Sequence, residues 1–109
     1  MSNSNANNNV NNELTETPVK VALITGGSKR IGAQTTRVLH DAGYKVVIHC
    51  RLSREEADAL ADELNQLRAD SARVIQGDLN VDTIYNYIIE QAHQCWGRLD
   101  VLVNNASAF

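Results

Sequence analysis

"VKVALITGGSKRIGAQTTRVLHDAG", residues 19–43, joins an apolar, β-branched run to a segment of helical periodicity through a turn with three glycines. Residues 19–25 predict a short strand buried on both faces, because such strands are continuously apolar. Gly43 predicts the end of the helix that follows. Strand, glycine turn and helix begin a parallel α/β unit. Helical spacing predicts the buried face of this helix as Ile31, Thr35, Val38, Leu39 and Ala42.

The same alternation continues along the rest of the sequence. Apolar runs predict three more strands, at 44–50, 72–77 and 99–105. A second helix is predicted after Ser53, which has Glu56 three residues on, in the spacing of a capping box. Its expected buried face is Ala57, Leu60, Ala61, Leu64 and Leu67.

A third helix is predicted over 81–97, closed by Gly97. Its periodicity places Ile84, Ile88 and Cys95 on one buried face. We interpret its remaining large side chains as helix-packing residues rather than functional groups: Tyr85, Tyr87, His93 and Trp96.

Strands that alternate with helices favour a parallel sheet with helices on both faces. Right-handed crossovers then restrict the topology. We therefore expect an α/β fold of the Rossmann type, a doubly wound parallel sheet of which the chain forms the N-terminal half (β-α-β-α-β-α-β). The expected strand order is 3-2-1-4, and ligands bind at the carboxyl ends of strands beside the switch point between strands 1 and 4.

Composition excludes several classes of protein. The 109 residues carry a net charge of −3 without a basic stripe, which argues against a nucleic-acid partner. No run of about 18 apolar residues exists, so no membrane span is expected. Cys50 and Cys95 lack ligand-like spacing, so we expect reduced thiols, no metal site and a cytoplasmic location, with a disulfide or metal pair as the weaker alternative.

The first 17 residues differ from the rest in composition. They are rich in asparagine and almost free of large apolar side chains. Such a tract buries too little surface to offset its ordering entropy, so residues 1–17 are predicted to be a disordered tail. A self-associating asparagine tract is the alternative. Residues 18–109 then form the folded part.

The strand ends carry the unusual residues. Gly26 permits a sharp turn after the first strand, and the following helix directs its free N–H groups into that turn. Gly32 allows close approach of a diphosphate, so the segment suits a dinucleotide; a plain glycine-rich turn is the alternative. The second strand ends in Arg51, where NAD-preferring sites have an acid. Arg51, Lys29 and Arg30 suit a ribose 2′-phosphate unless Arg51 is simply solvated.

The third and fourth strand ends are polar. The carboxylate of Asp78 either accepts a hydrogen bond from an adenine amino group or caps the next helix, for which Asn80 and Asp82 compete. The amides of Asn104 and Asn105 bind neighbouring strand ends or line a cofactor cleft.

"TGGSKRIG", "GDL" and "NNAS" at these intervals resemble the short-chain dehydrogenase/reductase family, whose usual patterns are TGxxx[AG]xG and NNAG. Arg30 and Ser107 depart from those patterns. Both departures, with "HCRLSREEADAL" and "NNASAF", resemble the pteridine reductase subgroup. The resemblance covers residues 19–109, and Cys50 stands where an aromatic is usual.

The resemblance implies a role for each matching residue. The cofactor would be NADPH, with Asp78 and Leu79 at the adenine. Arg30, Ser107 and Phe109 would contact a pterin or folate substrate, with Phe109 stacked on its ring. The full set of implied cofactor contacts is Gly26, Ser28, Lys29, Arg30, Ile31, Gly32, His49, Arg51, Ser53, Asp78, Leu79, Asn105, Ala106 and Ser107.

The family's catalytic Tyr-x-x-x-Lys pair is absent from the sequence, so no catalytic residue is assigned. The resemblance implies the N-terminal cofactor half of an NADPH-dependent reductase that is inactive alone and whose complete relatives are usually homotetramers. Other short-chain carbonyl reductases, such as oxoacyl or sugar reductases, are the alternative activity. A non-catalytic nucleotide-binding fragment and the product of a broken gene are the alternatives outside enzymes.

Overall fold

The computed structural model describes residues 18–106. Residues 1–17, for which a tail is predicted, and residues 107–109, which include Ser107 and Phe109, lie outside the described part. All seven predicted elements are present, and the first and last strands are shorter than predicted. The elements are β1 (Val21–Ile24), α2 (Arg30–Asp41), β2 (Lys45–Cys50), α3 (Arg54–Leu67), β3 (Ala72–Gln76), α4 (Asp82–Trp96) and β4 (Val101–Val103).

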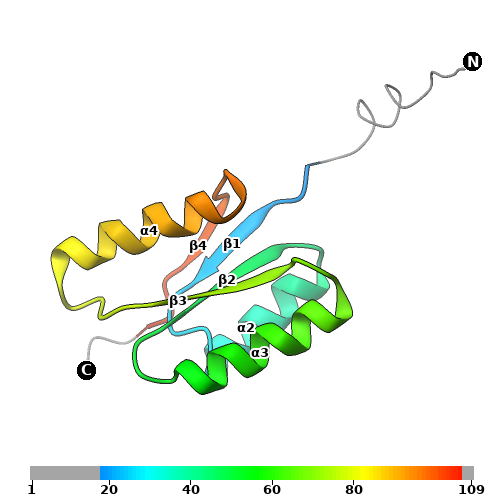
Figure 1. Ribbon diagram of the computed structural model, residues 1–109, viewed down its shortest axis with the longest axis horizontal. Coiled ribbons are helices and arrows are strands. Elements are labelled where there is room, and N and C mark those ends of the chain that lie inside the picture. Colours follow the sequence, from blue (N-terminus) through cyan, green and yellow to red (C-terminus); the bar gives the residue numbers. More distant parts are fainter. Residues whose placement is uncertain (1–17, 107–109) are drawn as a thin grey trace, which may run out of the picture.

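The four strands form one parallel sheet in the order β3-β2-β1-β4, which confirms the predicted fold and order (Figure 1). β1 lies in the middle, paired with β2 on one side and with β4 on the other. All four residues of β1 are fully buried, as the continuous apolar run predicts. The carboxyl ends of all four strands therefore meet along one edge.

Helices cover both faces of the sheet. In Figure 1, α2 and α3 lie on one side and α4 lies alone on the other. The face under α3 packs Ile24, Ile48 and Leu64 into one core cluster. The opposite face packs Leu23 and Ile88 into a second cluster. None of the helices within residues 18–106 is long and apolar enough to cross a membrane.

The predicted buried face of α2 is only partly correct, because Leu39 packs against the first core cluster but other members of the face do not. Ile31 and Val38 are 69% and 65% exposed, whereas Thr36 and His40 are buried. Polar contacts determine this orientation. The Thr36 hydroxyl donates to the backbone oxygens of Gly27 and Gly32, and His40 Nε2 lies 2.7 Å from the Ser71 hydroxyl.

The helix starts also depart from expectation. Ser53 precedes α3, but its side chain makes no capping hydrogen bond, so the predicted capping box is not formed. Glu56 instead lies near Lys29, with 3.6 Å between carboxylate and ammonium. Most of the predicted α3 face is buried, but Leu67 is 74% exposed.

The outer side chains of α4 divide into two groups. Tyr87 and His93 are exposed on its outer surface, so the packing role predicted for them is wrong. Trp96 is half-buried against the second core cluster. Gly97 ends the helix as predicted.

Several charged residues at the amino ends of the strands are paired with one another. Asp70 accepts hydrogen bonds from Arg73 at 3.0 Å and from the Trp96 indole at 3.3 Å, and it lies 3.8 Å from Lys45 Nζ. The guanidinium of Arg73 and the ammonium of Lys45 lie 4.5 and 5.1 Å from the Trp96 ring centre. This cluster fixes the end of α4 against the sheet.

Candidate functional site

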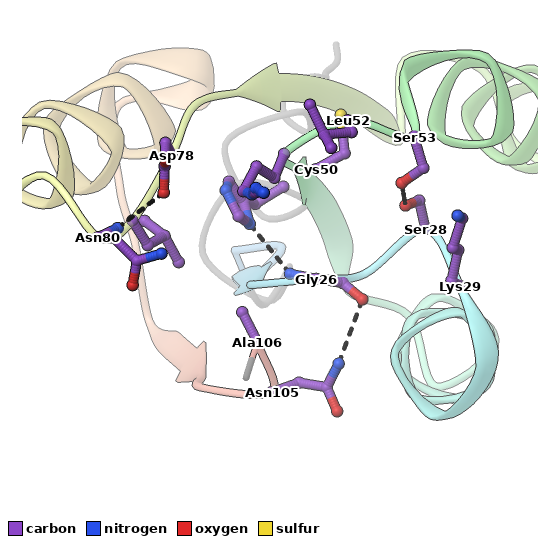
Figure 2. A pocket seen from close by; sticks show the side chains of 13 residues that line it. Gly26, Ser28, Lys29, Cys50, Leu52, Ser53, Asp78, Asn80, Asn105 and Ala106 are labelled. Atoms are coloured by element: carbon purple, nitrogen blue, oxygen red, sulfur yellow. Dashed lines mark hydrogen bonds between the residues drawn. The ribbon is translucent and has the colours of Figure 1, made fainter. Parts of the chain in front are cut away.

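A cleft of about 460 Å³ opens at the carboxyl ends of the strands, where the first turn meets the segments that follow β2, β3 and β4 (Figure 2). Residues from all four strand ends line it, as the fold predicts for a switch point. Ten of the residues singled out from the sequence are among them: Gly26, Ser28, Lys29, His49, Arg51, Ser53, Asp78, Leu79, Asn105 and Ala106.

Three predicted contact residues do not line this cleft. Arg30 and Ile31 begin α2 and are exposed outside it, and Gly32 lies beneath the first turn. A Cβ on Gly32 would lie 2.0 Å from the Gly26 carbonyl oxygen and 2.6 Å from Asn105 Nδ2. In the structure, Gly32 therefore permits the close approach of α2 to the turn.

Hydrogen bonds from two backbone amides hold the first turn to β2. Gly26 has a φ of 63°, in the region that favours glycine. Its N–H donates to His49 Nδ1 at 3.0 Å, and the Gly27 N–H donates to the His49 carbonyl oxygen at 2.9 Å. Two amides of the glycine turn are thus already bonded within the protein.

The same turn is held to the end of β4. The Thr25 hydroxyl oxygen accepts hydrogen bonds from the backbone N–H groups of Asn105 at 2.8 Å and Ala106 at 3.0 Å. The Asn105 side chain donates to the Gly26 carbonyl oxygen at 3.2 Å, as Figure 2 shows. Asn105 therefore does both things expected of it, binding a neighbouring strand end and lining the cleft.

Cations and hydroxyls gather on the side of the cleft formed by the first turn and the start of α3. The hydroxyl oxygens of Ser28 and Ser53 lie 2.5 Å apart (Figure 2). Lys29 is paired with Glu56 at 3.6 Å, and both side chains are exposed. Arg51 makes no ion pair with any residue in 18–106. The opening of the cleft thus combines positive charge with hydroxyl groups.

Arg30 adopts an unusual backbone conformation at the first residue of α2. Its φ is 52°, in the left-handed region that non-glycine residues rarely adopt. Such strain costs about 1–2 kcal/mol and is concentrated at functional sites. The side chain is exposed, and no residue preference in this stretch indicates the conformation.

Asp78 stabilises the turn after β3 rather than the helix. Its Oδ1 accepts a hydrogen bond from the Asn80 N–H at 3.0 Å. Val81 is the residue before α4, and no side chain caps that helix. The capping alternative for Asp78 is therefore wrong, and its carboxylate lines the cleft.

Three residues that line the cleft were not predicted: Cys50, Leu52 and Asn80. Burial raises the pKa of the Cys50 thiol, which keeps it neutral. Leu52 is 79% exposed in a polar segment. Its position as a lone apolar residue between Arg51 and Ser53, two residues after β2, is the signal that could have identified it.

The parallel sheet with a polar cleft at its switch point defines a Rossmann-type α/β domain. This chain belongs to the short chain dehydrogenase family, whose pattern matches residues 20–108. Members of this family are oxidoreductases that use nicotinamide cofactors.

Several curated relatives support this assignment. Pteridine reductase 1 from Leishmania tarentolae is 39% identical, covering 82% of this chain and 37% of that protein. A short-chain dehydrogenase/reductase from Pestalotiopsis microspora is 36% identical, covering 80% and 32%. An uncharacterized oxidoreductase from Methylorubrum extorquens is 37% identical, covering 83% and 36%. The chain thus spans about a third of the length of these relatives.

Proposed function

We propose that this chain forms the NADPH-binding part of a short-chain reductase, of the type that transfers hydride from NADPH to a pterin or folate. The observation that carries the choice of cofactor is Arg51, a cation at the end of β2 without an ion pair among the described residues. NAD-preferring sites have an acid at the corresponding place, which holds the ribose 2′-OH. A guanidinium there suits the charge of a 2′-phosphate.

The neighbours of Arg51 support a phosphate ligand. Ser28 and Ser53 present two adjacent hydroxyls on the same side of the cleft as Lys29. Hydroxyls donate to phosphate oxygens, and hydrogen bonds to charged groups are stronger than neutral ones. Asp78 is the one acid among the described residues that line the cleft, and it lies across from Ser28 and Ser53 in Figure 2. We assign Asp78 and Leu79 to the adenine.

The backbone supports a diphosphate at the start of α2. The amides of Gly26 and Gly27 are used by His49, so the donors that remain for a ligand belong to residues 28–32. These include the first residues of α2, where unpaired N–H groups and the helix dipole favour anions. Arg30 and Ile31 contribute there, while Gly32 keeps the helix close to the turn.

The pterin assignment rests on similarity. A relative at 39% identity is named pteridine reductase. Arg30 and residues 104–109, which include Ser107 and Phe109, resemble that subgroup. Asn105, Ala106 and Ser107 are proposed to lie beside the nicotinamide ribose. The alternative is that the complete enzyme reduces an oxoacyl or other carbonyl substrate, which assays of the complete enzyme with a set of candidate substrates would reveal. A cytoplasmic homotetramer is proposed for the complete protein.

NADPH supplies the hydride when bound. The residues of this chain hold and orient the cofactor, but no Tyr-x-x-x-Lys pair is present to donate a proton. We therefore expect no turnover by the 109-residue chain. The test follows NADPH absorbance with dihydrobiopterin or dihydrofolate. Turnover above the buffer rate that is lost in Arg30→Ala would contradict this expectation.

The cofactor preference is tested by titrating NADPH and NADH against the wild type and Arg51→Ala. Loss of one charge-assisted contact should weaken NADPH binding by roughly 1.5–3 kcal/mol, about 10–150-fold, with little effect on NADH. Arg54→Ala is the control, because Arg54 is paired with Asp58 and does not line the cleft. Equal losses for both cofactors in Arg51→Ala would sink the assignment.

A further inference from the structure

The imidazole of His49 is enclosed between the first turn and the end of β3. Its exposed fraction is 2%. Nδ1 accepts the Gly26 N–H at 3.0 Å, a bond drawn in Figure 2, and Nε2 lies 2.8 Å from the Gly77 carbonyl oxygen. Both ring nitrogens therefore contact backbone groups from strand ends on opposite sides of β2.

These two backbone groups require one form of the ring. An amide N–H only donates, so Nδ1 must lack a proton. A carbonyl oxygen only accepts, so Nε2 must carry one. Both requirements are met by the same neutral tautomer. A doubly protonated ring would place an N–H against the Gly26 N–H and lose that bond.

We propose that His49 is a positioning residue whose neutral imidazole joins the Gly26 turn to the Gly77 strand end and so sets the shape of the cofactor cleft between them. Gly26 precedes the proposed phosphate contacts, and Gly77 immediately precedes Asp78, which is assigned to the adenine. The ring thus spans the two halves of the proposed ligand site. The identity of the ligand in this inference rests on the proposed function. The hydrogen bonds of the ring do not depend on it.

The surroundings favour the neutral ring. Burial lowers the pKa of His49, with the Gly77 hydrogen bond acting in the opposite direction. The charged side chains that line the same cleft are Lys29 from the first turn, Arg51 after β2 and Asp78 after β3. A direct phosphate contact by His49 would require the ring to give up one of its two backbone bonds, which is why we assign it to the backbone.

The first test needs no ligand. ¹⁵N NMR of histidine-labelled 109-residue chain should show His49 with an unprotonated Nδ1 and a protonated Nε2 at neutral pH. The opposite tautomer, or a charged ring at neutral pH, would overturn the proposal. This result is independent of whether NADPH binds.

Two variants separate the two bonds. His49→Asn places an amide oxygen near the Nδ1 position and keeps an acceptor for Gly26. His49→Gln reaches the Nε2 position and keeps only the donor to Gly77. In His49→Gln we expect faster hydrogen exchange of the Gly26 amide and at least tenfold weaker NADPH binding than in the wild type. In His49→Asn we expect the exchange rate and the NADPH affinity to lie within about threefold of the wild-type values.

His40→Leu is the matched control. His40 is also buried, at 3% exposure, but bonds to Ser71 away from the cleft. It should lower the melting temperature without selectively exposing the Gly26 amide. Equal effects of His49→Gln and His49→Asn on Gly26 exchange would overturn the positioning role. A wild-type chain whose Gly26 amide is protected from hydrogen exchange but which binds no NADPH would instead overturn the proposed function alone.

Discussion

The two ends of the sheet use charge differently. At the amino ends of the strands, several acids and cations are paired: Asp70 with Arg73 and Lys45, and Asp100 with Arg98. At the carboxyl ends, Arg51 has no ion pair among the described residues, and Lys29 is paired with Glu56 at 3.6 Å through two exposed side chains. Charge at the amino ends supports the fold, and charge at the carboxyl ends remains available to a ligand.

The carboxyl ends are held together by uncharged groups instead. Thr25, His49 and Asn105 connect the first turn to both neighbouring strand ends through neutral hydrogen bonds. Since neutral groups maintain the shape, removing a cation there should alter binding and leave stability unchanged. The opposite outcome is expected at the amino ends.

The largest effect is expected from Gly32→Ala, which would directly disturb the packing of α2 against the first turn at the carboxyl ends. The new Cβ would lie 2.0 Å from a backbone oxygen, so α2 or the turn must move. We expect a loss of roughly 3 kcal/mol or more in unfolding free energy, measured by urea denaturation. Gln34→Ala, at an exposed position on the same helix, is the control. A Gly32→Ala variant as stable as this control would show that the turn is loosely packed.

The next largest effect is expected from Trp96→Ala at the amino ends. The change removes a half-buried ring, its two cation contacts and its hydrogen bond to Asp70. We expect a loss of about 2–3 kcal/mol in unfolding free energy, with the NADPH affinity of the folded fraction unchanged. Tyr87→Ala, at 51% exposure on the same helix, should have little effect on either quantity. Weakened NADPH binding in Trp96→Ala would contradict the proposal that the amino ends serve stability and the carboxyl ends serve binding.

A smaller effect is expected from Arg30→Gly. Glycine tolerates the φ of 52°, but it also gains entropy in the unfolded chain, so stability should change by at most about 1 kcal/mol, in the stabilising direction. NADPH binding should weaken because a cation is lost. Arg30→Lys keeps the charge and should keep the affinity. Improved stability together with unchanged NADPH affinity in Arg30→Gly would remove Arg30 from the proposed site.

The smallest effect is expected from Asp100→Asn in acid. The Arg98 guanidinium and the Val21 N–H lower the pKa of Asp100 to about 2. Its contribution to stability is therefore present above an ordinary aspartate pKa near 4 and is lost as the pH falls through about 2. Asp100→Asn should flatten the decline in urea midpoint over this window. A decline as steep as that of the wild type would show that the pair does not stabilise the fold.

The sequence predicted the fold well because four apolar runs and their turns are local signals. Strand order followed from the alternation of elements. The strand ends, together with the family resemblance, then identified ten of the residues that line the cleft. The buried face of α2 was only partly predicted because hydrogen bonds bury two polar residues. Thr36 bonds to the carbonyl of Gly27 in the first turn, and His40 bonds to Ser71, which is distant in sequence. The predicted capping box is not formed, because the Ser53 hydroxyl lies against that of Ser28 instead.

The backbone conformation of Arg30 and the contacts of the His49 ring could not be predicted from neighbouring residues either. Arg30 adopts a positive φ that no residue preference indicates. The family resemblance implies only a cofactor contact for His49, and that role stays a prediction. Its two backbone partners belong to different strand ends, so only the folded sheet brings them to the ring.

The most direct test compares two arginines at opposite ends of the sheet. Melting temperature and NADPH affinity are measured in parallel for Arg51→Ala and Arg73→Ala, which remove the same charge. We predict that Arg51→Ala loses at least tenfold in NADPH affinity with an unchanged melting temperature, and that Arg73→Ala melts lower with unchanged affinity. Equal loss of affinity in both variants, or a lower melting temperature with full affinity in Arg51→Ala, would contradict the division of charge between the two ends.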